Sequence, residues 1–390
     1  MDKVGQARGL PGHFWLITLA NFLMFLNTAL LFLLPRRIQE LGGDEAQIGI
    51  IMGSFGVTAL ATIPWVSRRI DLHGSRPFMV AGLILMASAT AGYAFLDRMS
   101  YLFVPVRLLQ GLAFAMMFNG ATTAVTLCVP RARMGQGLGI FGAVTIASHA
   151  IGPALAEHLV ERVGFTLFFP LAAVSSLLAI PLALRIPATR RVESGPSPAG
   201  GFFRMAARSD LMVPLGVTLL IGTGFGGVLN FLAAYTATLS LKISDFFLTY
   251  SAMVIVVRLL GGQASDRAGR EAVLLPSLVV CGLGLFGIAL IQSQGALFWM
   301  GVVYGLGHGL LYPTLNAQVV DWTGAQERGT AMGVFNASFT AGVNFCSFGL
   351  GPVAKEFGFP TMYTVCGAAL WLAAVGVALD WCRRKKRAAL

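Results

Sequence analysis

The chain has 390 residues, of which 56% are hydrophobic and only 12% are charged, and its formal net charge is +11. Soluble domains carry about 25% charged residues, so this chain cannot cover a water-facing surface and lipid must solvate most of it. The basic residues lie in short segments between apolar runs, which excludes nucleic acid as a partner.

Apolar runs long enough to cross a bilayer, about 20 residues each, follow one another along the whole chain. The first run comes after Lys3 and Arg8 and is too long for a cleavable signal peptide, so we expect it to be retained. In chain order the predicted spans are 13–34, 46–66, 78–97, 101–125, 135–158, 165–185, 211–235, 244–264, 272–292, 296–320, 328–351 and 360–381. The fold class that we predict is an all-α membrane protein with twelve transmembrane helices in two six-helix halves.

The long break between the sixth and seventh spans is polar and rich in Pro and Gly, which is typical of a linker. It divides the chain into four predicted parts. These are an N-terminal half over 1–185, a cytoplasmic linker over 186–210, a C-terminal half over 211–382 and a basic tail over 383–390.

The positions of Lys and Arg predict the orientation of the spans. If both termini are cytoplasmic, 20 of the 28 basic residues lie in cytoplasmic segments and six lie on the opposite side. Cytoplasmic segments of membrane proteins carry such an excess. The excess of Arg over Lys favours a bacterial source, and we therefore predict a protein of the bacterial inner membrane with both termini inside. We also expect the protein to be a monomer.

Two short patterns each occur twice, and the two copies are separated by about half the chain length. Asp71 and Gly74 follow the second span, and Asp266 and Gly269 follow the eighth with the same spacing. A Gly and a Phe two residues apart recur at 139 and 141 and again at 333 and 335. Two such echoes predict a duplicated fold.

At these residues the sequence resembles the major facilitator superfamily over its whole length. The second loop copy matches the family pattern G-x-x-x-D-R-x-G-R at Gly262, Asp266, Arg267, Gly269 and Arg270. The first copy keeps Asp71, Gly74 and Arg76 but has Ser67 and Leu72 where the family has other residues.

The resemblance implies a role for these loops in closing the cytoplasmic side. A helix start carries partial positive charge and free N–H groups, which a carboxylate can meet. In this family each loop carboxylate faces a helix start in the opposite half. Asp71 would then lie near Arg328, and Asp266 would lie near Arg133.

Two further patterns resemble those of proton-coupled exporters in this family. Arg107, Gln110 and Gly111 form R-x-x-Q-G in the fourth span. Gly152 and Pro153 form the start of a motif of drug/proton antiporters, although Ala-Glu follows in place of the expected Gly-Gly. The resemblance therefore favours export.

Polar residues inside the spans are the candidate substrate and proton pathway. Arg107 lies about 9 Å into the bilayer at 1.5 Å per residue, where an arginine needs water or a partner. Tyr304, His308 and Tyr312 share one helical face, and imidazole titrates near neutral pH. The remaining candidates are Gln110, His149, Asn21, Asn27 and Asn230, for which hydrogen bonding between helices is the alternative.

In the family, the first, fourth, seventh and tenth spans line a central cavity, and none of these spans has an Asp or Glu deep inside it. The sequence therefore does not identify the residue that would couple transport to protons. Our first hypothesis is a proton-coupled exporter of a small amphipathic compound such as a drug, a metabolite or a metal-chelating metabolite. The alternatives are a nutrient importer or facilitator and a non-transporting membrane sensor. The five cysteines are scattered, and no nucleophile triad, phosphate loop or metal box is present, so we expect no enzyme, cofactor or metal.

Overall fold

The computed structural model describes residues 10–130, 133–187, 199–261, 268–323 and 327–388, and every regular element in them is helical. The elements of the first part are α1 (Gly12–Leu30), η1 (Leu31–Leu33), α2 (Leu34–Glu40), α3 (Glu45–His73), α4 (Ser75–Gly92), η2 (Tyr93–Phe95), α5 (Phe103–Cys128) and α6 (Met134–Leu184). Those of the second part are α7 (Ala199–Ala206), α8 (Met212–Thr238), α9 (Ser244–Gly261), α11 (Arg270–Ala289), α12 (Gln294–Asp321) and α13 (Arg328–Ala388).

Among the described residues, eight helices are long and apolar enough to cross a membrane. Two of them, α6 and α13, are each divided by one non-helical glycine, Gly164 with φ 69° and Gly358 with φ 81°. Glycine tolerates this region of positive φ because it has no Cβ. Each of these long helices therefore consists of two helical segments that meet at a sharp turn.

The backbone repeats at the offset that the sequence predicts. Gly74 has φ 85° and ψ 164°, and Gly269, its counterpart in the predicted repeat, has φ 93° and ψ 151°. Each of these glycines immediately precedes a helix, α4 or α11. Gly164 and Gly358 also have similar angles and are separated by almost the same stretch of chain. Matching turns at matching offsets are what a duplicated chain would produce.

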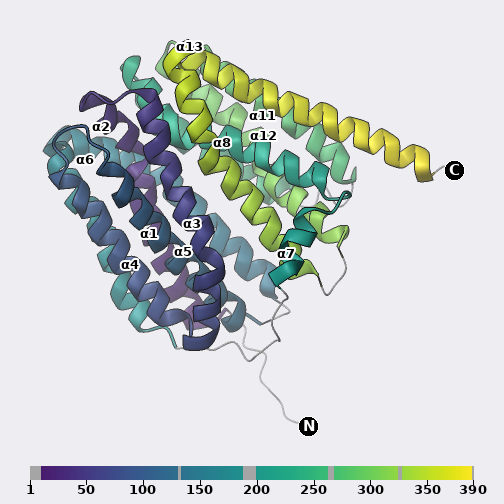
Figure 1. The fold of residues 1–390 in the computed structure, drawn as a ribbon, viewed down its shortest axis with the longest axis horizontal. Helices are drawn as coiled ribbons and strands as arrows, with labels where there is room; N and C mark the ends of the chain where they lie inside the picture. Colours follow the sequence, from purple (N-terminus) through teal and green to yellow (C-terminus); the bar gives the residue numbers. More distant parts are fainter. Residues whose placement is uncertain (1–9, 131–132, 188–198, 262–267, 324–326, 389–390) are drawn as a thin grey trace, which may run out of the picture.

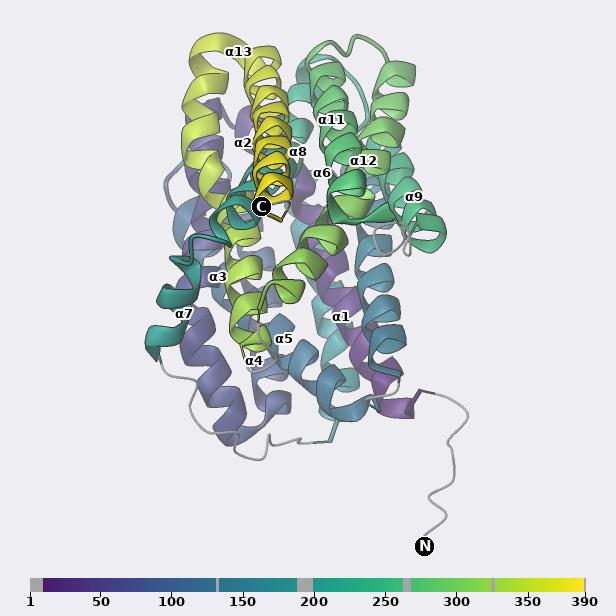
Figure 2. The same cartoon turned by 90° about the vertical axis from the view of Figure 1, so that its right-hand side faces the viewer.

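The helices form two groups that lie side by side (Figure 1), one of α1 to α6 and one of α8 to α13. We call the end of the bundle where α6 ends at Leu184 and α8 begins at Met212 the linker end, and the end that holds Gly164 and Gly358 the far end. In Figure 1 the groups meet at the top and diverge toward the bottom and right. Figure 2 shows the same helices turned by 90°, with most of both groups along a common direction.

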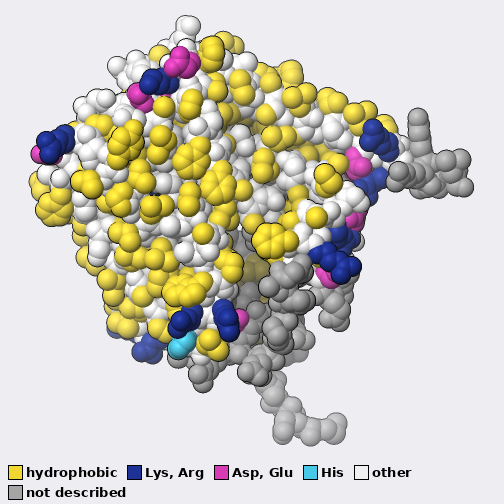
Figure 3. All heavy atoms as spheres, viewed as in Figure 1, with side chains coloured by type: hydrophobic (Ala, Val, Ile, Leu, Met, Phe, Trp, Pro, Cys, Tyr) yellow, Lys and Arg dark blue, Asp and Glu magenta, His cyan; other side chains and the backbone are white. Residues whose placement is uncertain are grey.

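The outer surface is apolar between the two ends. In Figure 3 hydrophobic side chains cover the middle of the visible face, and charged side chains gather near its edges. A broad exposed apolar surface of this kind is stable when lipid covers it.

The helices match the predicted spans in position but extend beyond several of them. Helix α3 continues to His73, past the predicted end at 66, and includes Arg68 and Arg69. The first helical stretch continues through η1 into α2, which has Pro35 near its start, and ends at Glu40 rather than at 34. Hydropathy marks where lipid ends, whereas backbone hydrogen bonding continues into water, so the helices are longer than the apolar runs.

Small residues bring α8 and α13 into close contact within the second group. A Cβ at Gly226 would lie 2.8 Å from the Cys346 Sγ and would also meet the Val343 carbonyl, whereas a Cβ at Gly216 in the same helix would meet nothing within 4 Å. Close approach through glycine is a common way of packing helices in membranes.

We predict that Gly226→Ala destabilises the protein by about 1–3 kcal/mol, because the new methyl group overpacks the contact with α13. Gly216→Ala is the matched control and should be neutral or slightly stabilising, because alanine is a better helix former than glycine. Thermal unfolding of both variants in detergent measures the difference. Equal loss of stability in the two variants would show that the α8–α13 contact does not depend on the glycine.

Candidate functional site

Two ion pairs join the two groups of helices at the far end. Lys355 Nζ of α13 lies 3.0 Å from Asp44 Oδ2 at the start of α3. Lys242 Nζ, just before α9, lies 2.8 Å from Glu161 Oε1 of α6. Glu161 and Lys355 are as far apart in the chain as Gly164 and Gly358, so they are equivalent positions of the repeat. The acid of one ion pair thus stands where the other pair has its base.

Asp44 also stabilises the helix that it precedes. Its Oδ1 accepts a hydrogen bond from the Gln47 backbone N–H at 2.8 Å, and the Asp44 backbone N–H donates to Gln47 Oε1 at 3.0 Å. This reciprocal arrangement is a capping box. The Gln47 N–H, and after it Lys355, holds the pKa of Asp44 below its ordinary value. Asp44 is therefore charged at neutral pH.

A buried carboxylate closes one side of the far end. Glu157 of α6 is only 7% exposed, and its Oε1 accepts a hydrogen bond from the Ile243 backbone N–H at 2.7 Å. It thus meets the start of α9, where N–H groups have no partner within the helix.

A glycine closes the other side. Gly351 stands at the position that the repeat makes equivalent to Glu157. A Cβ there would lie 2.7 Å from the Glu45 carbonyl oxygen and 3.1 Å from the Gly49 Cα. The contact between α3 and α13 continues toward the linker end as far as Gly56 and Asn344. The two groups are thus in close contact over the far half of their lengths.

Aromatic rings connect the two groups below this closure. Phe32 lies 5.0 Å from Phe247, and His149 lies 6.5 Å from Phe225, measured between ring centroids. Phe225 also stacks on His308 at 4.8 Å. A continuous series of rings therefore runs from η1 and α6 of the first group into α8, α9 and α12 of the second.

Among these rings, His308 is buried and can form hydrogen bonds through both ring nitrogens. It is 4% exposed, its Nδ1 lies 3.0 Å from the Tyr250 hydroxyl, and its Nε2 has no partner among the described residues. Tyr304, one turn earlier, stacks on it at 5.6 Å, as the shared face in the sequence predicts. Tyr312, one turn later, donates a hydrogen bond from its hydroxyl to Asn336 Oδ1 at 2.6 Å.

Arg107 and Gln110 belong to a buried hydrogen-bond network within the first group. Arg107 Nη1 and the Tyr93 hydroxyl both donate to Gln110 Oε1, at 3.0 Å and 2.9 Å. Gln110 Nε2 donates to Thr90 Oγ1 at 3.0 Å, and the Thr90 hydroxyl donates to Asn27 Oδ1 at 2.9 Å.

The network has no carboxylate among the described residues. The Arg107 guanidinium lies instead 5.3 Å from the Phe55 ring and 3.2 Å from Met52 Sδ. Thr90 and Tyr93 are members that we did not predict, because single polar residues in an apolar run carry no pattern.

The other predicted asparagines also form hydrogen bonds between helices. Asn27 Nδ2 donates to the Ala172 carbonyl at 2.9 Å, and Asn21 Nδ2 donates to Thr145 Oγ1 at 2.9 Å. Asn230 Nδ2 donates to the Val343 carbonyl at 3.0 Å and to Ser347 Oγ at 2.8 Å. These contacts fit the alternative reading, in which such residues join helices.

Part of the predicted linker-end gate lies outside the described residues. This applies to Gly262, Asp266 and Arg267 and to the side chain of Arg328. Of the described members, Asp71 and Arg76 are exposed, and Asp71 forms no hydrogen bond or ion pair with a described residue.

The remaining gate residues lie at helix boundaries. Gly74 and Gly269 precede α4 and α11, and Arg133 precedes α6. Arg270 pairs with Asp321 at 3.1 Å, within the second group. The closing role predicted for these loops stays a prediction.

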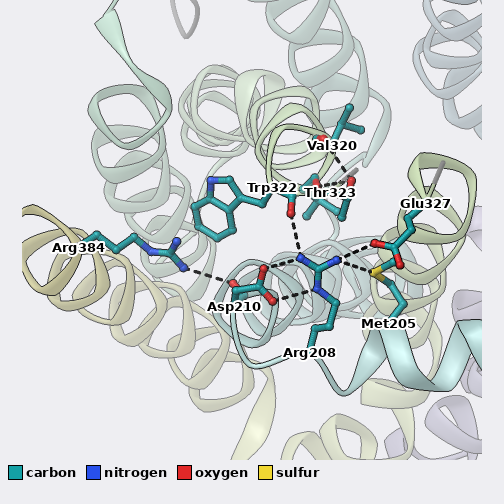
Figure 4. Close-up of polar contacts among 9 residues, drawn as sticks. Met205, Arg208, Asp210, Val320, Trp322, Thr323, Glu327 and Arg384 are labelled. Carbon is teal, nitrogen blue, oxygen red and sulfur yellow. Dashed lines mark hydrogen bonds and ion pairs between the residues drawn. The ribbon is translucent and has the colours of Figure 1, made fainter. Parts of the chain in front are cut away.

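A polar cluster attaches the linker to the second group (Figure 4). Arg208 lies 2.7 Å from Asp210 and 3.0 Å from Glu327, and it donates to the Trp322 carbonyl at 3.0 Å. Arg384 of α13 lies 3.8 Å from the Trp322 ring and donates to the Asp210 carbonyl. Arg208 holds the pKa of Asp210 below its ordinary value, so the carboxylate stays charged at neutral pH.

Comparison with known proteins gives one family and several relatives. The family model described as Major Facilitator Superfamily matches residues 15–291 and 217–390. The staphylopine export protein of Staphylococcus aureus is 24% identical over 354 residues, 87% of this chain and 89% of the relative. A multi-drug resistance efflux pump PmrA homolog of Lactococcus lactis is 26% identical over 302 residues, 73% of each chain.

Among solved structures, the nucleoside transporter NupG has a TM-score of 0.76 at 15% identity, with 95% of this chain and 99% of that chain covered. A POT family transporter bound to 5-aminolevulinic acid has a TM-score of 0.77 at 14% identity, with 96% of each chain covered. At these identities the likeness establishes the fold.

We predict that Gly351→Ala opens the far end. The added methyl group would contact the Glu45 carbonyl and force α3 and α13 apart. Spin labels at Glu40 and Glu356, in a variant with the native cysteines replaced, should show a distance distribution shifted to longer values. Gly349→Ala is the control, because its Cβ would meet nothing within 4 Å. Identical distributions in the two variants would contradict the tight contact.

We predict that the linker cluster resists acidification over the physiological range. The pKa of Asp210 is lowered, so its stabilising charge is fully present when the pH is above the ordinary carboxyl pKa of about 3.9. The charge is lost only when the pH falls through the lowered pKa. Amide exchange in residues 205–215, corrected for intrinsic rates, should therefore be constant from about pH 8 to about pH 5.

Asp210→Asn should raise amide exchange in this segment by about twofold to fivefold, because an exposed pair contributes little. Asp97→Asn, at an exposed far-end position, should leave the exchange unchanged. A loss of protection in the unmodified protein near pH 6 would contradict the prediction.

Proposed function

The chain belongs to the major facilitator superfamily, which makes it a multi-pass transport protein rather than an enzyme, and we propose that it is a proton-coupled exporter of a small amphipathic compound. Alternating access would carry the compound past the ring cluster between the two groups. The named export proteins among its relatives support this direction of transport.

The observation that carries the proposal is the one-sided contact between the groups. Two ion pairs, Glu157 and Gly351 join them at the far end, while the groups diverge toward the linker end (Figure 1). A transporter that rocks between two states needs contacts of this kind, which form in one state and break in the other. We therefore interpret this conformation as open toward the linker end.

The same proposal includes the topology. Dividing α6 and α13 at their glycine turns and adding α9 and α12 to the apolar helices gives twelve crossings in two halves. The excess of Lys and Arg in the linker-end connections supports a cytoplasmic linker end and cytoplasmic termini in a bacterial inner membrane. We propose a monomer as the transporting unit.

Titratable groups for proton coupling are few. His149 and His308 lie in the ring cluster, and Glu157 is a buried carboxylate at the contact between the groups. Glu157 is the strongest candidate, because its hydrogen bond to the start of α9 must break when the far end opens. Protonation would weaken this charge-assisted hydrogen bond and so favour opening.

Flux in proteoliposomes with an acidic interior tests the proposal. We expect uptake of a transported amphipathic compound from a diverse panel to rise about fivefold or more when the proton gradient is imposed, and an uncoupler should abolish the rise. Glu157→Gln should lose most of the stimulation, whereas His158→Ala, an exposed neighbour in α6, should retain it. Flux that is the same with and without the proton gradient would exclude proton coupling. Accumulation only in the direction of import would favour a nutrient importer.

A further inference from the structure

The middle of the membrane region contains basic and neutral groups but no acid. Each of the 17 Asp and Glu residues lies outside the predicted spans or among the first two or last two residues of a span. Arg107 and Arg258, by contrast, lie within spans, and Arg258 donates to the Gly309 carbonyl at 3.1 Å. A compound in the pathway would therefore meet a region without negative charge.

The ring cluster at the contact between the groups brings together aromatic rings from both groups. We call His149, Phe225, His308, Tyr312 and Phe339 the two-histidine site. Phe225 lies between the histidines, 6.5 Å from the ring of one and 4.8 Å from the ring of the other. Phe339 lies 6.2 Å from Phe225 and 5.1 Å from Tyr312. Rings at these separations stack or meet edge to face, which an added aromatic ring can continue.

Both histidines have hydrogen-bonding capacity that the protein does not use. The His308 side chain is more than nine-tenths buried, and its Nε2 has no partner among the described residues. His149 contacts Phe25, Phe32 and Phe225 through its ring and forms no hydrogen bond with a described residue. A buried polar atom without a partner is costly, and a ligand that supplies the partner removes that cost.

We propose that the two-histidine site binds a planar aromatic compound that is uncharged or anionic, with the histidines of the two helix groups donating or accepting its hydrogen bonds. This inference rests on the proposed transport function and specifies the class of compound that is carried. A permanent organic cation is disfavoured, because Arg107 and Arg258 place positive charge in the spans and no carboxylate at this depth balances it. The rings of the site can attract a cation, so the cationic probe is the critical comparison in the test.

The position of the site suits alternating access. His149 belongs to α6 of the first group, whereas Phe225 and His308 belong to α8 and α12 of the second. A ligand held by both histidines would link the groups, and the link would change when they rock. The affinity for the bound compound would therefore differ between the two states of the transporter.

Three probes that share one ring system test the proposal by isothermal titration to the purified protein. They are naphthoate, naphthamide and trimethyl(naphthyl)ammonium. We expect the anion and the amide to bind and the cation to bind at least about tenfold more weakly. His308→Ala and His149→Ala should each weaken binding of the first two by about fivefold to tenfold, the range of one hydrogen bond.

Two further variants keep the test decisive. His158→Ala removes an exposed histidine from α6 and should change nothing. His149→Glu adds an acid to the site and should turn the preference toward the ammonium probe. Equal or tighter binding of the cation by the unmodified protein, or no binding of any probe, would overturn the proposed class.

Vesicle flux of the same probes separates this inference from the proposed function. Binding that depends on the two histidines, without flux under any gradient, would support the site but contradict the transporter. Flux that favours the cation would support the transporter but contradict the proposed class of compound.

Discussion

The contact between the two helix groups at the far end is the interaction on which the rest of the structure depends. It combines a buried carboxylate on a helix start, close glycine packing and two ion pairs, at positions related by the internal repeat. None of these elements is strong alone, since exposed ion pairs contribute little. Together they fix which end of the bundle is closed, and the divergence toward the linker end follows.

Closure at the far end also places the aromatic rings. Because η1, α6, α8 and α9 converge there, Phe32 meets Phe247 and His149 meets Phe225 just below the closure. In the transporter that we propose, the ring cluster is the innermost part of a pathway that opens toward the linker end. The unpartnered His308 Nε2 and the absence of acids deep in the spans are the basis of the chemical preference that we propose for this site.

Several polar residues predicted to line the pathway form hydrogen bonds within the helix groups. Arg107 and Gln110 join Tyr93, Thr90 and Asn27 in one network, and Asn230 joins α8 to α13. In lipid a polar side chain must find a partner or water, and both a cavity and a neighbouring helix satisfy it. The sequence could not distinguish these outcomes, because the partners are up to 145 residues apart.

The sequence by itself determined the helical class, the approximate spans, the loop glycines and the offset of the repeat, because lipid imposes apolar length and positive φ favours glycine. It also identified the shared face of Tyr304 and His308, since helical spacing is local. Only the tertiary structure decided that Glu157 meets the start of α9, that Asp44 pairs with Lys355 and that His149 approaches Phe225. Those contacts depend on how two separately patterned groups of helices pack, and no local pattern encodes that packing.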